Sequence, residues 1–215
     1  MLIDGQSLWL AETNTYVVAP ERGGLAVVVD APPDPDGVLQ LLAKHDLTPA
    51  GLVVTHGHID HIGGAGPIVR STGVSAYVHP DDDYLTLNPL SQLQQLFGMI
   101  PPGDFEPPEQ FEPLVDGQNL TIAGLDIEVI QTPGHTPGHC CFLLKSEGVL
   151  FSGDQLFAGS IGRTDLPGGD FRALMESMAT KVLPLDDEVK VLPGHGPPTT
   201  VGDERRTNPF LTGLR

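Results

Sequence analysis

The sequence predicts an α/β fold with mixed sheets, and three observations lead to that class. Short continuous apolar runs, each bounded by turn residues, recur along the chain and are typical of strands buried on both faces. Apolar residues spaced three and four apart predict amphipathic helices between some of these runs. Strands come early, helices are interspersed and further strands follow, which is the order of an α/β protein. With 215 residues and no evident linker, we expect one domain over residues 1–215.

The strands are predicted from continuous or alternating apolar residues. Continuous apolar runs predict strands at residues 25–29, 52–54, 149–151 and 189–192. Residues 119–130 alternate in polarity on both sides of Ala123 and Gly124, which predicts a β-hairpin. Further strands are expected at residues 74–78 and 140–144.

Helices are predicted where apolar residues fall on one face. Residues 171–183 carry such a stripe, and Asp170 is a candidate N-cap. A shorter helix follows Asp36, and His45 continues its stripe, so we expect a half-buried helix histidine there. The acidic, proline-rich stretch 81–110 contains a possible short helix at residues 91–97. A long excursion of this kind often forms part of a site wall or lid.

The composition excludes several classes of function. Lys and Arg number 11 against 28 Asp and Glu, which gives a net charge of -17. Nucleic-acid binding and binding to an anionic membrane surface both need a basic face, so neither is expected. No apolar run approaches the ~18 residues that a membrane-spanning helix requires. The expectation is a soluble, loop-rich globular protein.

The two cysteines, Cys140 and Cys141, are adjacent in the sequence. Successive strand residues point to opposite faces, so a disulfide between them is not expected, and the spacing of a redox or zinc pair is missing. They are predicted to be two small hydrophobic residues in a strand. The N-terminus has no basic segment followed by an apolar core, which predicts a cytoplasmic location.

The segment THGHIDHIGG, residues 55–64, carries the clearest functional signal. His56, His58, Asp60 and His61 lie within six residues, directly after a predicted strand, and this pattern arises by chance in about one such sequence in a thousand. Neutral imidazole nitrogens and carboxylate oxygens are zinc ligands. One ion cannot easily use all four side chains of so short a loop. We therefore expect them to be divided between two neighbouring ions.

Three other predicted strands are each followed by a glycine and a potential ligand. His135 lies in TPGH after the hairpin, Asp154 in SGD after residues 149–151, and His195 in PGHG after residues 189–192. Open α/β sheets place their sites beyond the carboxyl ends of strands, so we expect these three side chains to join the first four.

These motifs resemble those of the metallo-β-lactamase-fold hydrolase superfamily, over essentially the whole chain. The resemblance implies a four-layer αβ/βα sandwich, with two mixed sheets between helices and the metal site at its edge. It also implies two metal ions and a bridging hydroxide, with the following ligands: His56, His58 and His135 for one ion, Asp60, His61 and His195 for the other, and Asp154 for both. Zinc β-lactamases carry cysteine in place of Asp154, which argues against β-lactam hydrolysis.

Within this superfamily, three segments resemble the shorter glyoxalase II proteins, the hydroxyacylglutathione hydrolases: IGRTDLPGG at 161–169, PGHGP at 193–197 and ERRTNPF at 204–210. The resemblance implies hydrolysis of an S-(2-hydroxyacyl)glutathione or a related acyl-thiol to a 2-hydroxy acid and a thiol. It implies two Zn²⁺ per chain, with Fe or Mn as other candidates. The longer glyoxalase II proteins have histidine in place of Gly57. They also carry a C-terminal helical domain that grips glutathione, for which the 20 residues after His195 leave no room.

The expected chemistry suits a thioester. Two dications would lower the pKa of a shared water toward neutrality, and a thiolate leaves without a strong general acid. Asp60 is expected to be a ligand and a possible proton acceptor. A persulfide dioxygenase with one iron on His56, His135 and Asp154 is an alternative. Hydrolysis of lactones or phosphodiesters and a non-catalytic metal-binding role are others.

Several further polar residues receive lesser roles. Arg163, Arg205 and Arg206 are the arginines nearest the motifs, and either they contact an anionic substrate or they form structural salt bridges. His139 is expected to orient neighbouring loops or ligands by hydrogen bonding rather than to bind metal directly.

One further histidine and two acidic sites near these motifs also have simple structural explanations. His79 is expected to be a loop histidine. Residues 81–83, three consecutive aspartates, could bind a cation but are predicted to form a solvated acidic turn. Asp30 ends the strand at residues 25–29 and either fixes the metal-binding loop or caps a turn.

Overall fold

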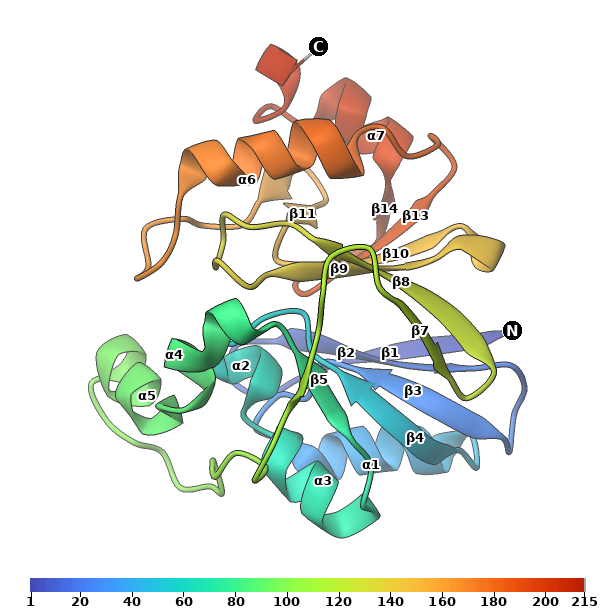
Figure 1. Cartoon of the computed structure of the whole chain (residues 1–215), viewed down its shortest axis with the longest axis vertical. Helices are drawn as coiled ribbons and strands as arrows, with labels where there is room; N and C mark the ends of the chain where they lie inside the picture. Colours follow the sequence, from blue (N-terminus) through green and yellow to red (C-terminus); the bar gives the residue numbers. More distant parts are fainter. Residues whose placement is uncertain (215) are drawn as a thin grey trace.

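The structure is a computed structural model that describes residues 1–214, apart from the side chains of residues 96 and 97. Two six-stranded mixed sheets face each other and helices cover the outer face of each sheet (Figure 1). This is the predicted four-layer sandwich, so the fold class is confirmed. None of the described helices is long and apolar enough to cross a membrane.

The first sheet is built by the first half of the chain. Its strands, in spatial order, are β1 (Leu2–Leu8), β2 (Thr13–Ala19), β3 (Leu25–Val29), β4 (Thr48–Val53), β5 (Ala76–Val78) and β6 (Glu112–Pro113). The pairs from β1 to β3 are antiparallel, and those from β3 to β6 are parallel. The parallel part ends at one edge of the sandwich, where the loop after β4 begins the THGHIDH motif.

The second sheet is built by the second half. Its strands are β7 (Asn119–Ile122), β8 (Leu125–Gln131), β9 (Cys140–Leu144), β10 (Val149–Gly153), β13 (Lys190–Pro193) and β14 (Thr199–Thr200). β10 and β13 are parallel neighbours, so the residues that follow them emerge side by side. The short strands β11 (Leu156–Phe157) and β12 (Ser160–Ile161) pair separately.

The helices lie outside the two sheets and around the site edge (Figure 1). They are α1 (Pro35–Lys44), α2 (Ile59–Ile62), α3 (Ala65–Thr72), α4 (Asp83–Thr86), α5 (Pro89–Phe97), α6 (Phe171–Ser177) and α7 (Val201–Thr207). The 3-10 turns are η1 (Pro80–Asp82), η2 (Lys145–Glu147) and η4 (Thr212–Leu214), and η3 (Met178–Val182) is a π-helical turn.

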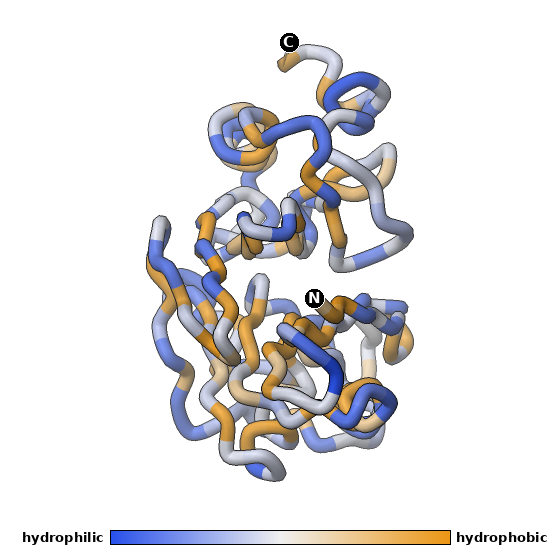
Figure 2. The backbone as a smooth tube through the Cα atoms, turned by 90° about the vertical axis from the view of Figure 1, so that its right-hand side faces the viewer, coloured by the Kyte–Doolittle hydropathy of each residue, from blue (hydrophilic) through white to orange (hydrophobic). Residues whose placement is uncertain are grey.

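The apolar runs are continuous because the strands are covered on both faces. Along β3, Val28 packs in the cluster under α1 and α3, whereas Val27 and Val29 pack in the layer between the two sheets. Phe142 and Val129 of the second sheet belong to the same middle layer. Figure 2 shows hydrophobic stretches along the strands of both halves. Burying one such side chain stabilises the fold by roughly 1.5–3 kcal/mol.

The predicted elements are largely confirmed, with three differences at helix ends. Asp170 accepts hydrogen bonds from the amides of Arg172 and Ala173, as a predicted N-cap should. The helix that it starts passes into the π-helical turn η3 after Ser177 instead of staying α-helical to residue 183. The shorter helix is capped by Asp34, and Asp36 lies inside its first turn. The helix expected at residues 91–97 begins at Pro89.

Candidate metal centre

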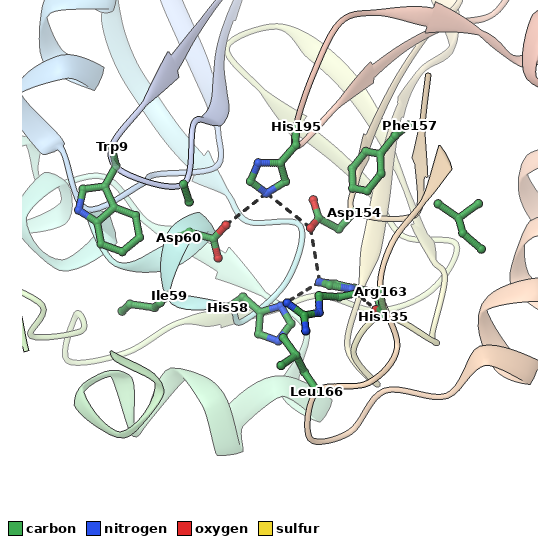
Figure 3. A pocket seen from close by; sticks show the side chains of 12 residues that line it. Trp9, His58, Ile59, Asp60, His135, Asp154, Phe157, Arg163, Leu166 and His195 are labelled. Atoms are coloured by element: carbon green, nitrogen blue, oxygen red, sulfur yellow. Dashed lines mark hydrogen bonds and ion pairs between the residues drawn. The ribbon is translucent and has the colours of Figure 1, made fainter. Parts of the chain in front are cut away.

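Loops from both sheets bring the seven predicted ligand residues to one edge of the sandwich. Figure 3 labels His58, Asp60, His135, Asp154 and His195 there. The loop after β4 and helix α2 carry the four residues of the THGHIDH motif. His135, Asp154 and His195 follow β8, β10 and β13, respectively. The first sheet therefore supplies four of these side chains and the second sheet supplies three.

His56, His58 and His135, the three-histidine group, point their ring nitrogens at one place. His58 Nδ1 lies 3.0 Å from His56 Nε2 and 2.8 Å from His135 Nε2, and the two Nε2 atoms are 3.2 Å apart. Hydrogen bonds cannot satisfy all three nitrogens, because each contact needs one donor and one acceptor. All three residues are buried. Three converging imidazoles in a dry setting are the donor set of a transition-metal ion.

Asp60, His61 and His195, the mixed group, form a second convergence. Asp60 Oδ2 lies 3.2 Å from His195 Nε2 and 3.5 Å from His61 Nε2, and the two histidine Nε2 atoms are 3.3 Å apart. His61 is fully buried, whereas the side chain of His195 is 30% exposed. This group combines a carboxylate with two imidazoles and opens toward solvent.

Asp154 lies between the two groups. Its Oδ2 atom is 3.5 Å from His135 Nε2 and 3.6 Å from His195 Nε2, and its Oδ1 atom is 3.4 Å from His61 Nε2. Oδ1 is buried without a hydrogen-bond partner in the described part of the chain. A buried carboxylate oxygen is costly unless it is paired or binds a cation. The donor set therefore fits two divalent cations, with Asp154 able to contact both.

The electrostatics keep most of these donors ready for a metal. Burial and the neighbouring His135 lower the pKa of His58 to about 3, so this imidazole is neutral. Burial opposes ionisation of Asp60 and Asp154, but charges and hydrogen bonds of neighbouring histidines, with His61 the strongest, together outweigh burial and hold the pKa of both carboxyls below the usual range. Burial disfavours a charge on His61, but the facing carboxylates outweigh it and raise its pKa. A metal ion at His61 would therefore displace a proton.

Hydrogen bonds behind the site orient the candidate ligands. Asp30 accepts from the Thr55 amide at 2.7 Å and contacts His61 Nδ1 at 2.8 Å. Of its two expected roles, Asp30 therefore has the first, which is to fix the metal-binding loop. His139 Nε2 accepts from the Asp154 amide at 3.0 Å, which is the orienting role expected for it. The Arg163 carbonyl contacts His135 Nδ1 at 2.7 Å, which turns Nε2 toward the site.

The prediction of a solvated turn at residues 81–83 is wrong for Asp82. Its carboxylate is buried and accepts from the Gly57 amide at 2.8 Å, the Thr136 hydroxyl at 2.7 Å and the Gly138 amide at 2.7 Å. Asp82 thus ties the loop of His56 and His58 to the loop of His135. The only sequence signal was Pro80, which begins the tight turn η1 and lets one of three aspartates point inward.

Gln92 of α5 is a second residue that the sequence did not single out. Its amide nitrogen donates to the Gly57 and Leu85 carbonyls, and its oxygen accepts from the Ile59 amide. Gly57 is enclosed by these contacts. A Cβ atom there would lie 2.9 Å from Leu85 Cβ and 3.0 Å from Asp82 Cβ. The structure therefore leaves little room for a side chain at residue 57.

The loop of His195 is held from the opposite sheet, which the sequence did not predict either. Asn14 of β2 donates its side-chain amide to the carbonyls of Pro193 and Gly196, at 3.0 and 2.9 Å. The Tyr16 hydroxyl donates to the Pro193 carbonyl at 2.7 Å. These contacts place His195 beside Asp60 across the gap between the two sheets.

The other weighed residues lie outside the convergence. Arg205 pairs with Asp187, and Arg206 pairs with Asp187 and Asp203, so both take the structural role. Arg163 lines the cavity described below, and its guanidinium donates two hydrogen bonds to Asp165.

Three predictions for residues remote from the centre agree with the structure. His45 caps α1 and lies half-buried with its Nε2 2.7 Å from an Asp4 oxygen. His79 lies in the loop before η1 and accepts from the Asp81 amide. Cys140 and Cys141 are free and buried in β9.

A cavity of about 460 Å³ opens directly over the candidate ligands. Figure 3 shows His58, Asp60, His135, Asp154 and His195 on its floor. Its walls are mostly apolar and include Trp9, Ile59, Phe157, Ile161 and Leu166. A small molecule that enters here meets the polar floor while its apolar part contacts these walls.

The comparisons with known proteins agree with this geometry. The family model described as the metallo-beta-lactamase superfamily matches residues 9–195. The chain is 38% identical to the hydroxyacylglutathione hydrolase GloC of Haemophilus influenzae, over 86% of this chain and 87% of that protein. It resembles the crystal structure of the B3 metallo-beta-lactamase BLEG-1, with a TM-score of 0.90, 37% identity, and coverage of 99% of this chain and 100% of that one. The di-iron-bound form of TTHA1623 matches with a TM-score of 0.85 and 38% identity, covering 97% and 100% of the two chains.

Proposed function

Because the chain belongs to the metallo-β-lactamase superfamily of metal-dependent hydrolases, we propose that it hydrolyses the thioester bond of an acyl-thiol, as a glyoxalase II-like enzyme. The substrate would be an S-(2-hydroxyacyl)glutathione or a related thioester, and the products a 2-hydroxy acid and a free thiol. We propose that residues 1–215 form a single domain of this fold.

The observation that carries this proposal is the position of Asp154 between the three-histidine group and the mixed group. Two adjacent donor sets with a shared carboxylate suit a two-ion hydrolytic centre better than a single iron. We propose Zn²⁺ as the metal, with Fe and Mn as the other candidates. The di-iron form of TTHA1623 supports keeping iron among them.

The roles of the residues follow from this assignment. The bound ions would lower the pKa of a water between them and polarise the substrate carbonyl. Asp60 faces the cavity, and its Oδ2 atom accepts a hydrogen bond from the Thr13 hydroxyl at 3.1 Å, which fixes the orientation of the carboxylate that we propose as a metal ligand and proton acceptor. Trp9 and Phe157 would exclude bulk water and contact the acyl group.

The lining of the cavity also favours a thioester over an amide as the substrate. Among the described residues that line it, there is no lysine, cysteine or tyrosine to protonate a leaving group. A thiolate does not need that help, because the pKa of its conjugate acid is far below those of alcohols and amines. The amine of an amide substrate would leave much more slowly from the same site.

Metal analysis combined with a thioesterase assay tests the proposal. The protein, purified and loaded with Zn²⁺, should contain two ions per chain and release thiol from S-lactoyl thioesters, as followed with a thiol-reactive dye. Asp154→Asn is the matched inactive control. A fully loaded protein that leaves every thioester intact would refute the proposal, and persulfide-dependent oxygen uptake by an iron-loaded sample would favour the dioxygenase instead.

The second candidate is β-lactam hydrolysis, favoured by the likeness to BLEG-1. Thioesters come first because the chain is also 38% identical to a hydroxyacylglutathione hydrolase and carries the three segments that resemble such enzymes. A chromogenic cephalosporin assayed beside the thioesters separates the two. Turnover of the cephalosporin above that of any thioester would reverse the order.

A further inference from the structure

A second groove of about 240 Å³ adjoins the cavity over the candidate ligands. His58 and Leu166 line both spaces, so the groove begins where the floor of the first cavity ends. α4, α5 and the segment at Leu166 and Pro167 form its sides. A substrate with its reacting carbon at Asp60 and Asp154 can therefore extend one arm past His58 into this groove.

The groove offers neutral hydrogen-bonding groups. Asn88, Ser91 and Gln95 line it, and in the described structure neither the Ser91 hydroxyl nor the Gln95 amide has a side-chain hydrogen bond. Gln92, by contrast, is fully engaged with backbone groups and only forms the base. Ser91 and Gln95 thus supply donors and acceptors that a ligand can use without displacing a protein contact.

No lysine, arginine, aspartate or glutamate is among the residues that line this groove. The adjoining cavity has one cationic wall residue, Arg163, and its two-pronged hydrogen bonds with Asp165 already compensate its charge. The chain as a whole carries a net charge of -17. An arm bearing several carboxylates or phosphates would meet no free cation here and would be repelled at longer range.

We propose that this groove binds the carrier arm of the acyl-thiol, and that this arm is uncharged and bears amide or hydroxyl groups. The inference rests on the proposed thioesterase function and narrows its substrates from glutathione or a related thiol to thioesters of a neutral thiol. The apolar walls of the larger cavity take the acyl group, and the polar groove takes the thiol side. Hydrolysis adds the hydroxyl of water to the acyl carbon and breaks the C–S bond, and the thiolate gains a proton and leaves with the carrier.

A series of lactoyl thioesters that differ only in the carrier tests the inference. The carriers are N-acetylcysteamine, which is short and neutral, pantetheine, which is longer and neutral with amides and hydroxyls, and glutathione and coenzyme A, which are anionic. The zinc-loaded enzyme should show a kcat/KM for the pantetheine ester at least about tenfold above the other three, mainly through KM. A glutathione or coenzyme A ester that equals or exceeds it would overturn the inference.

Two variants of α5 test whether the groove itself sets the preference for a neutral carrier. Gln95→Lys adds a cation to the lining and should raise kcat/KM for the glutathione ester about three- to tenfold relative to the pantetheine ester. Gln94→Lys adds the same charge one residue away, at a side chain outside the groove lining, and should leave that ratio unchanged. Equal changes in both variants would mean that only the overall charge matters, which would overturn the inference.

A binding measurement adds a readout that does not depend on turnover. An S-alkyl pantetheine thioether cannot be hydrolysed, and calorimetry should show that Ser91→Ala weakens its binding about three- to tenfold with the metal content unchanged. Unaltered affinity would contradict the proposed contact. If no thioester is cleaved at all, the proposed function itself fails, whereas cleavage with a different ranking of carriers refutes only this inference.

Discussion

The three-histidine group and the mixed group differ in charge, in exposure and in what holds them. The first consists of three buried imidazoles, and Asp82 braces two of its loops through backbone amides. The second includes a carboxylate and the partly exposed His195, whose loop is held by Asn14 and Tyr16 from the other sheet. Both groups join the two sheets, but a buried carboxylate fixes the loops of the first, whereas hydrogen bonds from β2 hold the partly exposed His195 loop of the second.

This difference predicts an order of metal loss. A buried donor set with fixed side chains loses little conformational entropy when it binds an ion, and a partly exposed histidine side chain loses more. We therefore expect an ion at the mixed group to leave first during dialysis against a chelator. The following predictions test this comparison, beginning with the residue that both groups share.

Asp154→Asn should weaken metal binding at both groups at once, because the Asp154 carboxylate contacts both of them. We expect kcat/KM to fall about a thousandfold, which is the size seen when a major electrostatic group is removed from a catalytic site. Mass spectrometry for metals should find fewer ions bound at both groups. Asp126→Asn, at an exposed carboxylate in β8, is the control and should retain both ions. Full metal occupancy in Asp154→Asn would contradict the shared role.

His135→Ala and His195→Ala should separate the two groups. His195→Ala should retain about one ion per chain and fold normally, since its side chain is partly exposed. His135→Ala removes a buried ring from the three-histidine group, so it should also lower the free energy of unfolding by about 2–4 kcal/mol. Metal content and thermal denaturation of both variants measure these outcomes. The same metal loss and the same Tm in both variants would mean that the two groups are equivalent.

Asp82→Asn should weaken the three-histidine group without removing a ligand. One of its two oxygens becomes a donor that faces the Gly57 amide or the Gly138 amide, so the two loops lose part of their connection. We expect metal affinity to fall about 10- to 100-fold, which is typical of residues that orient ligands. Asp81→Asn is the matched control, because its neighbouring carboxylate is exposed. Competition with a chromophoric chelator gives the affinities, and equal values for both variants would refute the bracing role.

Tyr16→Phe should have the smallest effect and act on the mixed group alone. It removes the hydrogen bond to the Pro193 carbonyl, which contributes about 1 kcal/mol to the free energy of unfolding. The first ion should bind unchanged, and the second should bind slightly more weakly. Tyr77→Phe is the control, since no hydrogen bond of its hydroxyl occurs in the described structure. Titration of the apo-protein with Zn²⁺ would reveal the difference.

The predictions from the sequence succeeded where the signal was local. The strand at residues 25–29 has the predicted bounds because its apolar run is complete within five residues. His135, Asp154 and His195 lie beyond strand ends, as predicted, each after a glycine at short range. No comparable local signal marked β1, where Gly5, Gln6 and Ser7 interrupt the apolar pattern at the sheet edge.

The missed supporting residues share a physical reason. Asn14 and Tyr16 act on a loop more than 170 residues away, as the separations of 179 and 177 positions show. Asp82 is one of three identical neighbours, and only the turn at Pro80 decides which of them is buried. Both depend on how distant segments pack, which residue spacing does not encode.

The position of the candidate centre on the line where the two sheets meet has a consequence for folding. Ions bound there would cross-link residues 56–61 to residues 135–195, and so join two halves of the chain that otherwise meet mainly through apolar packing. These cross-links would slow separation of the two halves. Chelation should therefore speed hydrogen exchange at the amides near the metal centre before exchange rises in the rest of the molecule. Metal supply would then govern how long the protein survives as well as how fast it works.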